Sequence, residues 1–130
     1  MTTLVVNEPP AAGLLAGMPG SAELLKEWGA RFAPSREAFR KDDVDTGLRL
    51  FADAVGGPGT YDRRSDGDRN MMFDNAASAV ADAISSRPRP VFTCEMAKRI
   101  SAPTLVMNGE RSPEFFHRIV DQLEKCLTER

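Results

Sequence analysis

Histidine and cysteine are scarce in this sequence, and their scarcity excludes several kinds of site. The chain has one histidine and two cysteines in 130 residues, too few for the ligand sets of zinc sites. Its net charge is −2, so it offers no basic surface with which to bind nucleic acid. We therefore expect no metal, no other cofactor and no nucleic-acid partner.

Long hydrophobic runs are also missing. No apolar stretch approaches the roughly 20 residues that a membrane span needs, and Met1, Thr2 and Thr3 lack the basic start of a signal peptide. We expect a cytoplasmic protein that does not bind membranes. Because cytosolic thiols stay reduced, free thiols at Cys94 and Cys126 are favoured over a disulfide, which remains the alternative.

The composition that is present is that of an ordinary globular domain, with 42% hydrophobic and 28% charged residues. Near its start, Leu4–Val6 is a short apolar run that predicts a strand. The strand ends before Glu8, and the proline that follows Glu8 predicts an extended backbone there. The length of the chain favours a single domain, 1–130.

A second strand is predicted late in the chain. Thr104–Met107 is an apolar run of the kind that is buried on both faces of a parallel sheet, and Pro103 marks its entry. Gly109 breaks this strand. Ser112 is then a good N-cap and Pro113 fits the first position of a helix.

Helical patterns fill most of the remaining chain. Apolar residues recur at helical spacing over 22–32, 35–55 with a polar break at 41–43, 69–86 and 113–127, and a helical turn is expected within 92–99. The residues expected to face inward are Phe39, Leu48, Phe51, Val55, Met72, Ala76, Val80, Ile84, Phe116, Ile119, Val120, Leu123 and Leu127. The expected fold is mostly helical α/β, with two short parallel strands, three to four helices between them and a C-terminal helix.

This order of elements resembles the middle of a lid-bearing α/β-hydrolase. Leu4–Pro10 is similar to the strand and exit before the helical cap, 47–77 is similar to cap helices, and Ile100–Pro113 is similar to the return strand and its loop. The resemblance implies an incomplete α/β-hydrolase fold. Within it, 1–10 would form the strand and exit loop, 11–99 the cap-like region, and 100–130 the return strand and C-terminal helix.

The chain departs from this family at the catalytic machinery. The family carries its nucleophile in a G-x-S-x-G turn and its base on a later histidine, and the sequence contains no such pentapeptide. His117 lies inside the last predicted helix, and we interpret it as a structural residue. The resemblance therefore implies a hydrolase-like chain that is inactive alone. The alternative is a small helical binding or interaction module that holds an apolar ligand or a partner chain.

One acidic residue is singled out by the resemblance. Some relatives place the triad acid after the earlier strand, and Glu8 stands there, so it is the best candidate; the alternative is an exposed loop glutamate. Many relatives instead have an aspartate in the later loop, near the position of Ser112. A serine cannot hold a histidine's charge as a carboxylate does. Glu110 in that loop is a weaker second candidate.

Other residue groups have more ordinary interpretations. A site built from His117, Glu114 and Asp121 has little support, because Glu114 and His117 are i,i+3 neighbours and are expected to pair on the surface. Met71–Phe73 is expected to pack in a core, with a pocket lining as the alternative. There are two acidic clusters: Asp42, Asp43 and Asp45, and Asp62, Asp66 and Asp68. The segment Asp62–Asp68 lacks the closing glutamate of a calcium loop and is expected to be solvated charge.

A sheet of two strands is marginal alone, and its exposed edges invite association. We therefore expect the chain to associate with itself or with a complementing chain through these edges.

Overall fold

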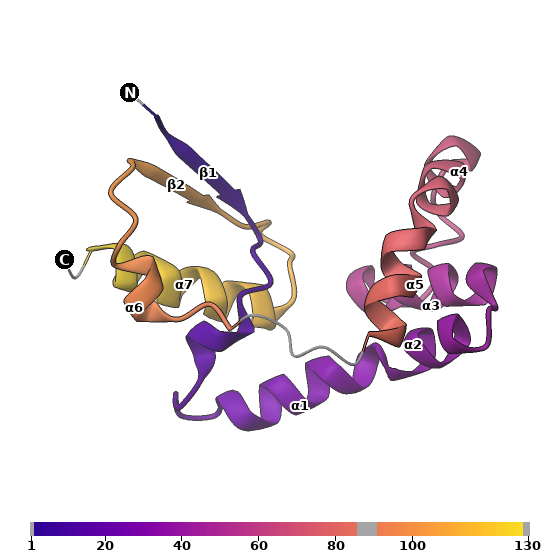
Figure 1. The fold of residues 1–130 in the computed structure, drawn as a ribbon, viewed down its shortest axis with the longest axis horizontal. Helices are drawn as coiled ribbons and strands as arrows, with labels where there is room; N and C mark the ends of the chain where they lie inside the picture. The colour runs from indigo at the N-terminus through magenta and orange to yellow at the C-terminus, as the bar shows by residue number, and fades with distance from the viewer. Residues whose placement is uncertain (1, 86–90, 129–130) are drawn as a thin grey trace. The chain divides into compact units, whose positions relative to one another are not determined.

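The computed structural model describes residues 2–85 and 91–128. It is mostly helical with two short parallel strands, as expected (Figure 1). The described residues form six α-helices between the strands where three to four were expected, because two of the predicted helices are each divided in two. The chain divides into two compact units: Met1–Lys26 together with Arg89–Arg130, and Glu27–Pro88. We call them the strand unit and the helical unit. The helical unit is shorter than the cap-like region expected over 11–99, because short helices near both ends of that range pack in the strand unit.

The two strands lie side by side in the strand unit. β1 (Leu4–Asn7) pairs in parallel with β2 (Thr104–Met107), with Leu4 opposite Thr104 and Asn7 opposite Met107. Pro103 lies just before β2, as its missing N–H requires, and its carbonyl accepts a hydrogen bond from the Leu4 N–H at 2.9 Å. The pairing brings together two segments that are about a hundred positions apart in the sequence.

One long helix covers one face of this strand pair. α7 (Glu114–Thr128) packs against β2, and both η1 (Ala12–Leu15) and α6 (Cys94–Ala97) pack against α7 (Figure 1). All five residues predicted to face inward on this helix are buried, and burying a large apolar side chain contributes about 1.5–3 kcal/mol. The buried residues of α7 are Phe115, Phe116, Ile119, Val120, Leu123, Cys126 and Leu127.

The other face of the strand pair is open. Successive side chains of a strand point to opposite faces, so Val5, Asn7, Leu105 and Met107 share the face opposite α7. All four are exposed, with Val5 at 58% and Leu105 at 55%. The expectation that Thr104–Met107 is buried on both faces is therefore wrong for this chain by itself. We call these four residues the open face.

A disulfide joins α6 to α7, between Cys94 and Cys126, whose Cα atoms are 5.3 Å apart. The expectation of free thiols is wrong, because a separation of 32 residues gives no sign that the two helices pack together. By restricting the unfolded chain, a closed loop of this length stabilises the fold by about 3–4 kcal/mol. Disulfides are typical of oxidising compartments, so this one weighs against the expected cytoplasmic location.

The helical unit contains the helices between the strands. α1 (Ser21–Arg31) leads into it, and α2 (Ala33–Arg40), α3 (Val44–Gly56), α4 (Asp66–Asp74) and α5 (Ala76–Ile84) complete it. Within the parts of the chain that the structure describes, no helix has both the length and the apolar character needed to cross a bilayer. The core of the unit is formed by Phe39, Leu48, Ala52, Tyr61, Ala76 and Ala83, with Met72 and Val80 packed against it.

Some details of the helical unit differ from the sequence predictions. The helix expected over 69–86 is two helices, and the first begins early because the Ser65 hydroxyl accepts a hydrogen bond from the Asp68 N–H at 3.1 Å. The helix expected to begin at Ser35 begins at Ala33, and Ser35 is buried in α2, where its hydroxyl donates to the Gly47 carbonyl at 3.0 Å. Phe51 and Ile84, expected inside, are 40% and 60% exposed.

Gly47 sets the distance between α2 and α3. A Cβ built at this position would lie 2.4 Å from the ring of Phe39, so the close contact between these helices requires a glycine. Gly29, in α1, is also a helical glycine, but a Cβ built there would meet no neighbouring atom within 4 Å. Alanine substitutions at Gly47 and Gly29 therefore separate the effect of helix propensity from the effect of packing.

We predict that Gly47→Ala destabilises the helical unit by about 1–2 kcal/mol, because overpacking outweighs the gain in helix propensity. Gly29→Ala is the control and should stabilise the unit by up to about 1 kcal/mol. Urea unfolding followed by the fluorescence of Trp28, the single tryptophan, measures both changes. Equal stabilisation by both variants would contradict the packing argument.

Candidate functional site

Glu8 lies where the two parallel strands end together. It follows β1, and its N–H donates to the Met107 carbonyl at 3.0 Å, which extends the pairing by one residue. Its side chain reaches the loop after β2, where carboxylate Oε1 accepts hydrogen bonds from the Gly109 N–H at 2.9 Å and from the Ser112 hydroxyl. In open α/β sheets, this carboxyl edge of the strands is where ligands bind.

The backbone of Glu8 is not extended as its proline neighbour predicts. Its φ is +46°, in the left-handed region that residues other than glycine rarely adopt. Such a conformation persists only where surrounding contacts determine it, and it is often found at functional sites. Here the contacts are the hydrogen bonds to the residues that follow β2, which no local sequence rule anticipates.

The carboxyl group of Glu8 is held in its ionised form. The hydrogen bond from Ser112, followed by that from the Gly109 N–H, lowers the pKa of Glu8 below its usual range, and the nearby imidazole of His117 adds to this effect. Partial burial of the group works in the opposite direction. Glu8 is therefore a fixed negative charge at neutral pH and a weak general base.

His117 lies in the same part of the strand unit, in α7. Its ring Nδ1 accepts a hydrogen bond from the side-chain amide of Asn108, the residue directly after β2. The structure thus brings His117 near Glu8, a proximity that sequence reasoning missed; its position in the first two turns of α7, directly after the β2 loop, is the signal that could have revealed it.

These residues do not form a nucleophile and base. The Ser112 hydroxyl donates to the carboxylate of Glu8, whereas a serine nucleophile would donate to an imidazole. α7 begins at Glu114, so Pro113 directly precedes it and the predicted N-cap Ser112 lies one residue earlier. Glu110 is exposed in this loop and has no hydrogen bond or ion pair with any residue that the structure describes.

The alternative site on α7 is not assembled. Glu114 pairs with Arg118 at 3.6 Å, one helical turn away, and not with His117 as expected. Asp121 is exposed on the same helix. The three residues His117, Glu114 and Asp121 therefore give no catalytic arrangement.

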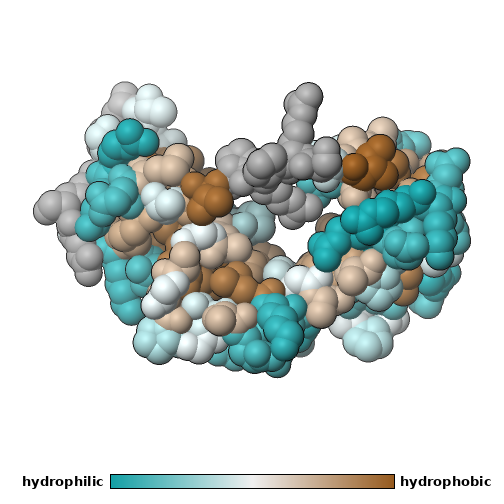
Figure 2. Space-filling view, turned by 60° about the horizontal axis from the view of Figure 1, so that its bottom comes forward, coloured by the Kyte–Doolittle hydropathy of each residue, from teal (hydrophilic) through white to brown (hydrophobic). Residues whose placement is uncertain are grey.

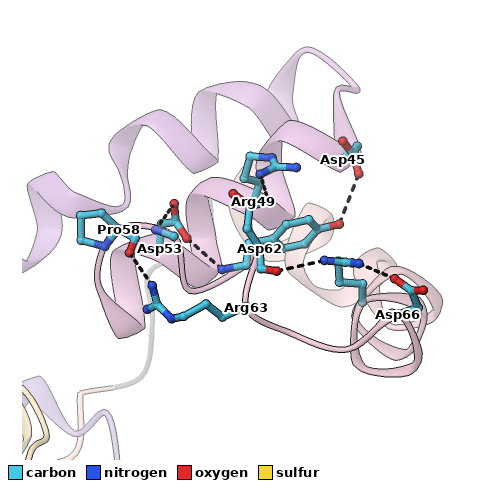
Figure 3. A network of polar contacts seen from close by, with 10 residues as sticks. Asp45, Arg49, Asp53, Pro58, Asp62, Arg63 and Asp66 are labelled. Carbon is cyan, nitrogen blue, oxygen red and sulfur yellow. Dashed lines mark hydrogen bonds and ion pairs between the residues drawn. The ribbon is translucent and has the colours of Figure 1, made fainter.

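Both acidic clusters serve the fold of the helical unit (Figure 3). Asp43 caps α3 by accepting from the Thr46 N–H at 3.2 Å. Asp62 pairs with Arg49, and Asp66 pairs with Arg69. These acidic side chains thus act in capping and pairing. Among the described residues no group of histidine, cysteine and acidic side chains could hold a metal ion.

Tyr61 is at the centre of this network. Its ring is buried, with the guanidinium of Arg49 4.8 Å from the ring centroid, and its hydroxyl donates to Asp45 at 3.3 Å. Burial, and then the charge of Asp45, raise the pKa of Tyr61. Asp53 accepts from the N–H groups of Tyr61 and Gly59 at 3.0 and 3.2 Å, which closes the turn after α3. These contacts fix the turn and give it a structural role.

The apolar run in α4 is divided between core and surface. Met72 packs against the core of the helical unit, as expected. Met71 and Phe73 are 59% and 57% exposed, so the expectation of core packing is wrong for these two. Figure 2 shows that hydrophobic residues also reach the surface in patches among hydrophilic ones.

Comparisons with protein-family models, with curated proteins and with solved structures found no match for this chain. The hydrolase resemblance therefore stays a prediction from the sequence.

We predict that the free energy of unfolding of the strand unit depends on pH through Glu8. Because the folded pKa lies below the unfolded value, the contribution is present above about pH 4.3 and is lost as the pH falls through the folded pKa. Glu8→Gln keeps a hydrogen-bond acceptor and removes the charge, so it should cost about 0.5–1 kcal/mol at pH 7 and nothing near pH 2. Urea unfolding followed by circular dichroism measures this, with Glu110→Gln as the control.

A constant difference between Glu8→Gln and the wild type from pH 7 to pH 2 would contradict the assigned ionisation. Glu110→Gln should match the wild type throughout, because Glu110 is exposed and unpaired among the described residues.

Proposed function

We propose that this chain is the cap-bearing, late-strand part of an α/β-hydrolase-like protein and is inactive alone. The single observation that carries the proposal is a parallel strand pair with a compact helical unit inserted between its strands and an ionised Glu8 at its carboxyl edge. A nucleophilic serine and a base histidine would come from a complementing chain, and Glu8 would supply the acid.

The connection between the strands supports this proposal. Parallel strands need a crossover, which is usually a single helix of a dozen or more residues. Here the crossover contains the whole unit Glu27–Pro88, with its own core. A cap inserted between neighbouring strands has this organisation, whereas a plain crossover does not.

The incompleteness of the sheet supports the need for a second chain. Only β1 and β2 pair in the described residues, so each strand keeps one outer edge without a partner strand. The open face adds exposed apolar side chains beside these edges. Parallel sheets are normally covered on both faces. Further strands and a covering helix from a complementing chain would satisfy both needs.

A binding or interaction module remains the second candidate. The observation in its favour is the exposure of Met71, Phe73 and Phe51 in the helical unit, where large apolar side chains would be available to an apolar ligand or a partner helix. This candidate requires no acid at the strand ends. It therefore does not explain the hydrogen bonds and the backbone conformation of Glu8.

We predict that the isolated chain hydrolyses a short-chain activated ester no faster than buffer does. The physical reason is that no serine donates to a histidine in the site, so no nucleophile is activated. Glu8→Gln and His117→Ala are the matched variants and should give the same background rate. Turnover that His117→Ala abolishes would overturn the proposal, because it would mean that residues of this chain form a complete catalytic site.

We predict that without its complement the chain associates with itself through the strand pair. Sedimentation velocity should show a dimer or larger species whose proportion grows with concentration. Val5→Lys and Leu105→Lys place a charge on the open face and should shift the chain to monomer by at least tenfold in dissociation constant without unfolding it, since both positions are more than half exposed. Ile84→Lys, at a similarly exposed position in the helical unit, is the control.

A wild-type chain that stays monomeric at millimolar concentration would count against an interface at the strand pair.

A further inference from the structure

We propose that Ser112 is a positioning residue: together with the Gly109 N–H it fixes one oxygen of the Glu8 carboxylate and leaves the other oxygen for a proton donor of the complementing chain. This inference rests on the proposed function and assigns a role to a residue that cannot itself replace the acid. In the hydrolase interpretation, the incoming donor is the N–H of an imidazole.

The hydrogen bonds of Glu8 are arranged unequally on its two oxygens. Both donors, the Gly109 N–H at 2.9 Å and the Ser112 hydroxyl, bind Oε1. No described residue hydrogen-bonds to Oε2. A glutamate whose role was only to join β1 to the loop after β2 could use either oxygen, whereas an acid that must receive an imidazole needs one oxygen held and the other available.

The loop after β2 is shaped for this contact. A Cβ at Gly109 would lie 2.8 Å from the Ser112 hydroxyl oxygen and 3.4 Å from Glu8 Oε1, so a side chain there would displace the Ser112 hydroxyl from its present position. The Ser112 N–H donates to the Gly109 carbonyl at 3.0 Å, which closes the turn that brings both donors to one side. We call Gly109 and Ser112 the Glu8 clamp.

The position of Glu8 in the chain explains why it needs the clamp. Its left-handed backbone is unfavourable for a residue with a side chain, and its partners lie 101 and 104 positions away. An aspartate in the later loop, as in many relatives, would be held by its own loop. An acid that follows the earlier strand has to be held by the later loop instead, and Ser112 supplies that contact.

A nucleophilic role for Ser112 is disfavoured by the same geometry. Its proton is directed at a carboxylate whose pKa is below the usual range, which makes that carboxylate a poor acceptor of a full proton. The hydroxyl therefore serves to hold Glu8.

The first test is a pH titration of the Gly109 amide by proton–nitrogen NMR on the full chain. Because this N–H donates to Glu8, its proton shift should titrate with a midpoint below the ordinary glutamate value of about 4.3. Ser112→Ala should raise the midpoint by about 0.5–1 pH unit, and Ser112→Thr, which keeps the hydroxyl, should restore it. Glu8→Gln should abolish the titration.

Two results would overturn the inference on the isolated chain. One is a Gly109 amide that does not titrate in the acid range in the wild type. The other is an unchanged midpoint in Ser112→Ala, with a dispersed spectrum to show that the variant is folded. Neither result depends on a complementing chain, so the clamp can be refuted while the hydrolase proposal stands.

The second test uses the complex with a chain that carries a G-x-S-x-G turn and a base histidine. In this complex Ser112→Ala should lower kcat for ester hydrolysis about tenfold with little change in KM, and Ser112→Thr should recover it. An active complex that Ser112→Ala leaves unchanged would overturn the positioning role. A titration that behaves as expected without turnover by such a complex would refute the proposed function and leave the clamp in place.

Discussion

The parallel pairing of β1 with β2 is the contact on which the rest of the strand unit depends. It joins residues 4–7 to residues 104–107. Closing so long a loop costs conformational entropy, and the contacts that form after closure must offset this cost. The pairing gives α7 a surface on which to pack, and it lets Glu8 reach the loop after β2. The helical unit has its own core, so the segment between the two strands is compact in the folded chain.

The electrostatics of the strand ends follow from this pairing. A carboxylate that accepts two hydrogen bonds on one oxygen is held ionised and in one orientation. An imidazole lies nearby, but its Nδ1 is occupied by Asn108. The site therefore contains an ionised carboxylate with one oxygen held by Gly109 and Ser112, and a histidine whose Nδ1 is in contact with Asn108. That combination is consistent with a contribution to a larger site and gives no complete catalytic group by itself.

Sequence reasoning predicted most of the elements but few of the contacts between them. Leu4–Val6, Thr104–Met107 and the apolar stripe of α7 are local patterns, and the structure has a strand or helix at each. The disulfide depends on the packing of α6 on α7, and the contact of Glu8 with Ser112 depends on a strand register. The exposure of Leu105 depends on whether another element packs on the open face, and none of the described residues covers it. Each of these requires distances between segments far apart in sequence, which periodicity and capping rules do not contain.

The open face explains why the apolar run Thr104–Met107 predicts a strand correctly but predicts its burial wrongly. Thr104–Met107 has the composition of a strand covered on both faces, yet Leu105 and Met107 are exposed beside Val5. A natural edge strand avoids association by means of charge, proline or a bulge, and none of these interrupts residues 104–107. In the described residues this strand has the composition of a sheet interior but lies in a sheet of two strands, and the proposed complementing chain is one way to cover it. By the same argument, the proposed complementing chain would have to supply a strand at each outer edge of the pair and an apolar cover for the open face. Both would lie beside Glu8, the acid of the proposed site.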